Sequence, residues 1–219
     1  MAPTPYFPAG LELPGFVPPL IGLEVILGVF FAVTAVLVAL AWLAGRSLCT
    51  PERVMAAWMV ATGAIHLVVE GAFSVQPAFF RNTDPNMLLL ELWKEYSKAD
   101  SRYATRDSFV VSMETVTAFV WGPACFLVFL GLIYRASWRW TLLLVVSVGQ
   151  LYGDVLYFAT CALEGGVHVR PEPLYFCFYF VFMNGIWIVV PSWCVLYAWR
   201  RCNAGVRLVD AAAKAKKRS

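Results

Sequence analysis

Five long apolar stretches, separated by shorter segments that hold most of the charges, dominate the hydrophobic pattern of this chain. They lie at residues 25–44, 54–75, 109–134, 140–163 and 174–199. Each reaches the length of about twenty residues that a helix needs to cross the hydrocarbon core of a bilayer. The pattern therefore predicts an all-α polytopic membrane protein with five transmembrane helices around an intramembrane cavity.

The basic residues between these stretches indicate how the chain is oriented. Arginines lie between the first and second stretches and between the third and fourth, and a basic segment follows the fifth. Because short basic segments stay on the cytosolic side, all three belong there. We therefore expect residues 1–20 to be an extracytosolic N-terminal segment, 21–200 the membrane domain and 201–219 a basic cytosolic tail. Residues 1–20 hold no Lys or Arg, so they do not predict a cleavable signal peptide.

The composition agrees with a membrane protein. Hydrophobic residues make up 60% of the chain and charged residues 14%, whereas soluble domains carry about a quarter charged residues. The net charge of +3 is small, and we expect the lipid bilayer, and no nucleic acid, among the partners. The six cysteines show no C-x-x-C spacing, which argues against a disulfide framework. Cys161 and Cys177, near the ends of neighbouring stretches, are the one pair that could meet.

Ionisable side chains inside the apolar stretches are the clearest functional signal, because burying them in hydrocarbon is costly. His66 and Glu70, four residues apart, share one face of the second predicted helix. Glu114, Asp154 and Asn184 lie in the third, fourth and fifth helices. A rise of about 1.5 Å per residue puts all five roughly 8–15 Å below the extracytosolic ends. We therefore predict that they line one polar site inside an apolar cavity.

Each polar residue also has a structural alternative. Asp154 and Asn184 are equally suited to hydrogen bonds between helices, and Glu114 to reaching the membrane interface. Acting together, carboxyl groups and an imidazole can exchange protons with a bound molecule or stabilise a buried cation. A metal ion held by His66, Glu70 and Glu114 is a less favoured alternative, and we expect no cofactor. The residues alone thus predict a proton-transfer or cation-binding site for a lipophilic molecule.

Three further segments carry open interpretations. Residues 76–108 contain a mixed apolar and charged run that predicts a short amphipathic helix on the membrane surface, which either caps the cavity or merely connects two helices. Gly149 and Gly153 allow close helix packing, within the molecule or in a homodimer. The last four residues, Lys-Lys-Arg-Ser, resemble a dilysine retrieval signal of the endoplasmic reticulum, with a generic basic tail as the alternative.

Five ungapped blocks of the sequence resemble the emopamil-binding protein family in the same order. They are GAIHLVVEG (63–71), LWKEYSKADSRY (92–103), METVTA (113–118), SVGQLYGD (147–154) and YFVFMNGIW (179–187). The resemblance covers roughly residues 15–200. It implies a five-helix membrane fold and a sterol Δ8–Δ7 isomerase of the endoplasmic reticulum, with no redox cofactor.

The same resemblance implies roles for single residues. The family reaction protonates the sterol at C9, forms a carbocation at C8 and removes a proton from C7. His66, Glu70 and Glu114 match the proton-transfer residues, and we expect the His66–Glu70 unit to donate and Glu114 to accept. The residues expected to bind the substrate are Thr117, Asn184, Trp187 and Asp154. Cationic amphiphilic drugs are expected as inhibitors, because an ammonium group mimics the carbocation.

Two other functions stay open at this point. The first is a sterol or cationic-amphiphile binding protein of the same fold that catalyses nothing, which only a product assay separates from an isomerase. The second is a proton-coupled transporter. Five unequal spans without an evident inverted repeat argue against the transporter.

Overall fold

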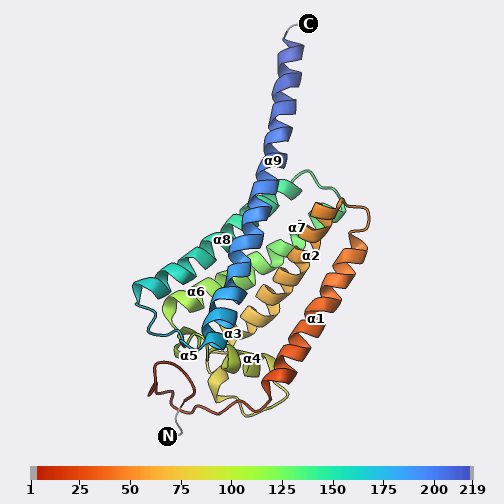
Figure 1. Cartoon of the computed structure of the whole chain (residues 1–219). Helices are drawn as coiled ribbons and strands as arrows, with labels where there is room; N and C mark the ends of the chain where they lie inside the picture. Colours follow the sequence, from red (N-terminus) through yellow and green to blue (C-terminus); the bar gives the residue numbers. More distant parts are fainter. Residues whose placement is uncertain (1–3, 218–219) are drawn as a thin grey trace.

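The computed structural model of the chain describes residues 4–217, which form a bundle of five long helical segments (Figure 1). The first segment is α1 (Leu23–Ala44), and the fourth is α8 (Arg139–Leu163). The second joins α2 (Thr50–Ala64), η1 (Ile65–Glu70) and α3 (Gly71–Val75), and the third joins α6 (Ser108–Val116), η3 (Thr117–Trp121) and α7 (Gly122–Ile133). The fifth joins η4 (Leu174–Met183) and α9 (Asn184–Lys216).

All five segments are long and apolar enough to cross a membrane, which confirms the predicted fold class. Both ends of four of them lie within about four residues of the predicted positions, because long apolar stretches leave little freedom in where a spanning helix can lie. The fifth differs. It continues as one helix past residue 199 to Lys216, so the basic tail projects from the bundle as an exposed helix (Figure 1).

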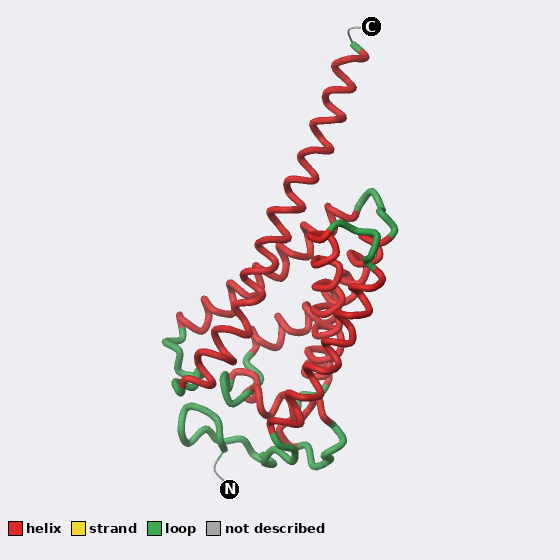
Figure 2. The backbone as a smooth tube through the Cα atoms, turned by 45° about the vertical axis from the view of Figure 1, so that its right-hand side comes forward, coloured by secondary structure: helices red, strands yellow, loops and turns green. Residues whose placement is uncertain are grey.

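The loops gather at the two ends of the bundle as the positions of the basic residues predict (Figure 2). At one end, Arg135 Nη2 donates a hydrogen bond of 3.1 Å to the Ser47 carbonyl, which joins the α1–α2 and α7–α8 loops. Arg201 of α9 approaches Glu52 of α2 at 3.6 Å at the same end. The N-terminal segment and the loops around residues 76–107 and 164–173 lie at the other end (Figures 1 and 2).

The helix predicted within residues 76–108 exists as α4 (Leu88–Tyr96), between the short elements η2 (Phe79–Arg81) and α5 (Arg102–Thr105). Its polar face does not meet water as a helix on a membrane surface would require. Glu91 and Lys94 are fully buried and form an ion pair of 2.7 Å. The N-terminal segment covers them, because Leu20 N donates to Glu91 and Tyr6 Oη donates to the Lys94 carbonyl. The helix therefore belongs to a packed cap over one end of the bundle.

Two hydrophobic clusters fill the two ends of the bundle. One lies under α4 and includes Phe73, Trp93 and Tyr157, and the other lies toward the tail and includes Met59, Val128 and Cys194. The polar residues of the spans line a cavity beside the first cluster, whose Trp93 and Tyr157 form part of its wall. The six cysteines are all free, and Cys161 is buried whereas Cys177 is exposed, so the pair named above is not bonded.

Of the two glycines of α8, Gly149 serves packing within the chain. A Cβ atom on Gly149 would overlap the indole ring of Trp121, whereas one on Gly153 would lie 3.7 Å from Met113, an ordinary contact. We expect Gly149→Ala to lower the free energy of unfolding by about 1–3 kcal/mol, because the ring must move. Gly153→Ala is the matched control and should change it little. Thermal unfolding of both variants in detergent tests this, and equal effects would contradict the assignment.

Candidate functional site

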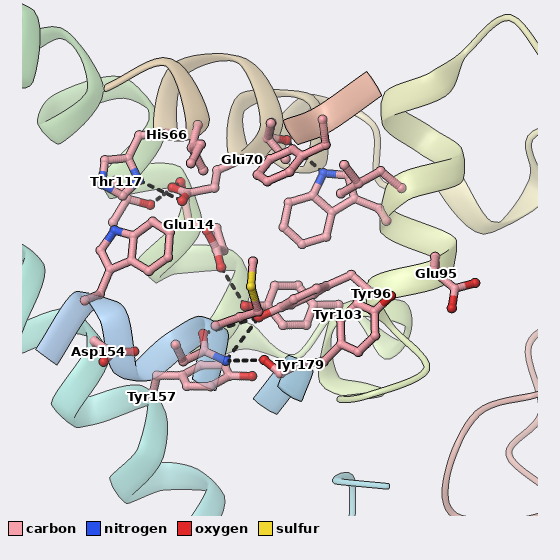
Figure 3. Close-up of a pocket in the computed structure, with 18 of the residues that line it drawn as sticks. His66, Glu70, Glu95, Tyr96, Tyr103, Glu114, Thr117, Asp154, Tyr157 and Tyr179 are labelled. Atoms are coloured by element: carbon pink, nitrogen blue, oxygen red, sulfur yellow. Dashed lines mark hydrogen bonds and ion pairs between the residues drawn. The ribbon is translucent and has the colours of Figure 1, made fainter. Parts of the chain in front are cut away.

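A cavity beside the first hydrophobic cluster is lined by the second to fifth segments, by α1 and by α4 (Figure 3). Its walls are mostly aliphatic and aromatic side chains, with a small number of polar groups. All seven residues that the sequence predicts for the site line this cavity: His66, Glu70, Glu114, Thr117, Asp154, Asn184 and Trp187. The prediction that polar residues at one depth converge is therefore confirmed, while their roles in catalysis and binding stay predictions.

The helices that carry the proton-transfer candidates widen locally into π turns. His66 and Glu70 lie in η1, and Thr117 begins η3 directly after the Glu114 turn. π turns are rare and occur mainly at functional sites. Gly122, which directly follows η3, lets the two turns approach each other. A Cβ atom at this position would lie only 3.0 Å from the Leu67 nitrogen in η1. Close backbone contact therefore fixes η1 against η3.

His66 uses both ring nitrogens. Nδ1 lies 2.7 Å from Oε1 of Glu70, and Nε2 lies 2.9 Å from the amide nitrogen of Gln150 and 3.1 Å from the Thr62 hydroxyl. Because an amide nitrogen can only donate, Nε2 accepts in this arrangement and the ring proton lies on Nδ1. The ring therefore donates to Glu70, whose second oxygen, Oε2, is buried without a hydrogen-bond partner within residues 4–217.

Thr62 joins the histidine to the tryptophan of the cavity. Its hydroxyl accepts from Trp187 Nε1 at 3.1 Å and from the Gln150 amide at 3.1 Å. The Trp187 ring centroid lies 6.3 Å from that of His66 and 5.6 Å from that of Trp58. Trp187 is thus held with its ring on the cavity wall, where an aromatic face can stabilise a cation.

Glu114 faces the cavity beside Glu70 and is held by a tyrosine (Figure 3). Tyr103 Oη donates to Glu114 Oε1 at 2.8 Å. Burial raises the pKa of Tyr103 well above its ordinary value, and the nearby Glu114 adds to the rise, so the phenol stays protonated and keeps donating. A hydrogen bond to the charged form favours a carboxylate, so Tyr103 favours the ionised form of Glu114.

The other predicted binding residues differ in how far they are already engaged. Thr117 donates its hydroxyl to the backbone, 2.9 Å from the Glu114 carbonyl. Asn184 Nδ2 donates to the Phe180 carbonyl at 2.8 Å and exchanges hydrogen bonds with Tyr96 of α4. The side chain of Asp154 makes no hydrogen bond within the described residues, and its Oδ2 is buried. Of the three, Asp154 alone presents an unengaged polar group to a ligand.

Sequence reasoning missed the tyrosines and underrated Gln150. Tyr96 and Tyr103 line the cavity from α4 and α5. The sequence predicts a helix in this connecting segment but does not show how the segment folds back over the cavity. Burial raises the pKa of Tyr96, so it too stays a protonated phenol. Gln150 was visible as a polar residue of the fourth span, and its place one turn before Asp154 on the same helix face was the signal that could have found it.

A buried ion pair next to Tyr103 contacts Tyr157, another residue of the cavity wall. Asp100 and Arg102 are 1% exposed and meet at 2.7 Å, and Tyr157 Oη donates to the same Asp100 oxygen at 2.7 Å. Burial alone lowers the pKa of Arg102, but its hydrogen bonds to Asp100 and the charge of Asp100 leave the pKa raised. The pair therefore stays charged, and it fixes the backbone beside Tyr103.

The alternative of a metal site gains no support from this geometry. Both nitrogens of His66 are engaged by Glu70, Gln150 and Thr62. Across residues 4–217, no group of three His, Cys, Asp or Glu side chains has an arrangement suited to a metal ion. The chemistry that the arrangement can perform is proton exchange by two carboxyl groups and an imidazole in a nonpolar cavity.

Gln150 is expected to position His66. In Gln150→Leu the Nε2 atom loses its amide donor, the ring can adopt the other tautomer, and the rate constant of any proton transfer should fall by about 10²-fold. The Michaelis constant should change little, because the leucine keeps the cavity apolar. Turnover of the purified variant in lipid nanodiscs measures this. Gln76→Leu, at an exposed position, is the control, and a wild-type rate constant in Gln150→Leu would contradict the role.

Comparison with known proteins gives one consistent group of relatives. The family model described as EXPERA (EXPanded EBP superfamily) matches residues 88–198. The chain is 42% identical to 3-beta-hydroxysteroid-Delta(8),Delta(7)-isomerase of Mus musculus, over 94% of this chain and 91% of the mouse protein. It is 36% identical to a probable isomerase of the same name from Arabidopsis thaliana, over 94% and 92% of the two chains.

A relative that matches a smaller share of the chain carries another name. Isomeliandiol synthase of Ailanthus altissima is 39% identical over 73% of this chain and 75% of its own. Proteins with different names therefore match this chain at similar identity, and similarity by itself does not fix the substrate.

Proposed function

The chain belongs to the EXPERA family, the expanded EBP superfamily, and from this premise we propose that it is a sterol Δ8,Δ7-isomerase of sterol biosynthesis. Family membership confirms the resemblance drawn from the five sequence blocks. The isomerase assignment is supported by the relatives named for that activity, which the chain matches along nearly its whole length. The observation that carries it in this chain is the pair of carboxyl groups, Glu70 and Glu114, that face one apolar cavity.

The proposed reaction moves a double bond without net change in composition. One proton is added at C9 of the C8=C9 bond, which leaves a carbocation at C8. Loss of a proton from C7 then forms the C7=C8 bond. The enzyme therefore has to supply one acid, one base and an environment that tolerates a transient positive charge.

We assign the His66–Glu70 unit as the acid and Glu114 as the base. Two adjacent carboxyl groups in an apolar cavity repel each other when both are ionised, so one of them holds the proton. Tyr103 donates to Glu114 and favours its carboxylate form. Glu70 Oε1 accepts from His66, and within residues 4–217 its Oε2 has no hydrogen-bond partner, which leaves that oxygen available to the substrate.

The surroundings suit the cationic intermediate. The ring of Trp187 lies on the cavity wall near His66, and the Glu114 carboxylate lies in the same layer. Both stabilise a buried positive charge. Cationic amphiphilic drugs should therefore bind as inhibitors, with the ammonium group in place of the carbocation.

We place the protein in the endoplasmic reticulum membrane with the C-terminus in the cytosol. The placement is supported by the basic loops and basic α9 extension that share one end of the bundle. A homodimer is a further proposal. Gly149 does not support it, because this residue packs on Trp121 within the chain. In the proposed dilysine signal, Lys216 ends α9, whereas residues 218 and 219 lie outside the described residues.

Expression in a yeast strain that lacks its sterol isomerase tests the proposed function. Gas chromatography–mass spectrometry of the sterols should show Δ8 sterols converted to Δ7 sterols by the wild-type chain and not by the Glu70→Gln variant. Immunoblotting of the membrane fraction confirms equal expression. Persistent Δ8 sterol beside well-expressed wild-type protein would overturn the isomerase and favour a binding protein that catalyses nothing.

A further inference from the structure

The hydroxyl group of Tyr179 takes no part in the proposed proton transfer and lies away from it. Tyr179 of η4 lines the cavity and is 5% exposed, and its phenolic oxygen is buried without a hydrogen-bond partner within residues 4–217. A buried hydroxyl group that forms no hydrogen bond destabilises the folded state, so the fold gains nothing from it. A phenylalanine would fill the same space at lower cost.

The ring that carries this hydroxyl is held in place. It stacks on Tyr175 with centroids 5.9 Å apart and meets Tyr96 edge-on at 6.2 Å. Tyr96 in turn is anchored to Asn184 through its own hydroxyl. The Tyr179 oxygen is therefore a fixed donor and acceptor, and not a group that turns away to water.

A carboxylate lies near this hydroxyl. Glu95 of α4 lines the same cavity, is 5% exposed, and lies close enough for its charge to act on Tyr179. Its Oε2 pairs with Lys98 at 2.5 Å, and within the described residues its Oε1 makes no hydrogen bond. Together the two side chains offer one donor and one acceptor, which is what a single alcohol group requires.

The two polar ends of the cavity are separate. Figure 3 shows Glu95, Tyr96 and Tyr179 on one side and His66, Glu70 and Glu114 on the other. Between the ends the wall includes apolar side chains such as Leu92 and Phe178. A ligand that satisfies both ends therefore has an apolar body with a hydroxyl at one extremity and its reactive bond further in.

The position of Tyr179 also suits a molecule that arrives from a membrane. It lies five residues into the fifth segment, which begins at Leu174, so it is about 7–8 Å from that end of the span. Amphiphilic alcohols in a bilayer keep the hydroxyl near the interface and the rings in the hydrocarbon. A sterol can thus enter with the same orientation that it has in the bilayer.

From these contacts we propose that Tyr179 and Glu95 form the subsite for the 3β-hydroxyl group of the sterol substrate. The proposal rests on the proposed function for its ligand class, and it adds the residues that select a 3β-hydroxysteroid over its deoxy analogue. The hydroxyl is carried by ring A, one fused ring from the reacting bond of ring B. Binding it at the α4 end places ring B toward Glu70 and Glu114.

The test compares a Δ8 sterol with its 3-deoxy analogue in wild-type protein and in Tyr179→Phe, using direct binding to protein in nanodiscs. The wild type should prefer the alcohol by about tenfold, the usual value of a hydrogen bond to a buried partner. In Tyr179→Phe the preference should nearly vanish because the alcohol binds more weakly, while affinity for the deoxy analogue stays unchanged. Glu95→Gln should show a smaller loss of preference.

Two controls make the result decisive. Tyr175→Phe removes a hydroxyl from the stacked neighbour that does not line the cavity, and it should keep the full preference. Asp154→Asn tests another unengaged polar group of the cavity. An unchanged preference in Tyr179→Phe, or a preference lost only in Asp154→Asn, would overturn the subsite. Because the readout is binding, absence of isomerisation would defeat the proposed function without affecting this result.

Discussion

Replacing Glu114 by glutamine should lower the rate constant for isomerisation by about 10²–10⁴-fold, the usual contribution of a general base. Glutamine has nearly the same size, and its carbonyl can still accept the hydrogen bond from Tyr103 that holds Glu114 in place. It cannot take up a proton from C7. Turnover of a Δ8 sterol by the purified variant, followed by gas chromatography–mass spectrometry, measures the loss, and full turnover would defeat the assignment.

The companion variant Glu70→Gln should lose turnover to a similar degree. The affinity for an ammonium ligand distinguishes the roles of the two carboxyl groups. If Glu114 is the carboxylate and Glu70 holds the proton, only Glu114→Gln removes a negative charge from the cavity. Binding of a lipophilic tertiary ammonium should then weaken by roughly 10–100-fold in Glu114→Gln and by much less in Glu70→Gln. The reverse order would exchange the acid and the base.

Glu24→Gln supplies the control for both measurements. Glu24 lies in the first turn of α1, is exposed, and does not line the cavity. Its variant should keep wild-type turnover and ammonium affinity. A loss in this variant would show that any change of carboxyl groups disturbs the protein in its detergent or lipid environment.

The fold was predictable because a bilayer imposes a length and a composition on any helix that crosses it. The same constraint made the site predictable in outline. Helices of known rise cross a fixed thickness, so Glu70, Glu114 and Asp154 could be placed in one layer from their positions in the sequence. The structure brings them to one cavity, as that calculation requires.

The sequence could not predict features that depend on how a connecting segment packs or on local helix geometry. Tyr103 and Tyr96 reach the cavity from short helices in a connecting segment, and their positions depend on how that segment folds back over the bundle. The π turns in η1 and η3 were equally invisible, since no residue pattern distinguishes them from α-helix in an apolar run. The burial of Glu91 and Lys94 under the N-terminal segment is a third case, because a charged helix face usually meets water.

We expect the largest effect on stability from the buried ion pair of Asp100 and Arg102, next to Tyr103. In Arg102→Met, Asp100 becomes a buried carboxylate that keeps Tyr157 as its side-chain partner, and removal of one member of a buried pair costs about 3–5 kcal/mol. Thermal and denaturant unfolding in detergent measure the loss. Arg170→Met is the matched control, because Arg170 pairs with Glu172 on the surface and such pairs contribute about 0–1 kcal/mol.

The double variant Asp100→Asn/Arg102→Met separates the buried charge from the loss of packing. With both charges removed, no uncompensated carboxylate remains, so the double variant should unfold at a higher temperature than Arg102→Met alone. Equal stability of Arg102→Met and Arg170→Met would contradict a role for the buried pair. Arg102 directly precedes Tyr103, which donates a hydrogen bond to Glu114. The double variant should therefore still show reduced turnover, although it is more stable than Arg102→Met. The ion pair then acts on catalysis by fixing one tyrosine, and its charge is dispensable to the fold.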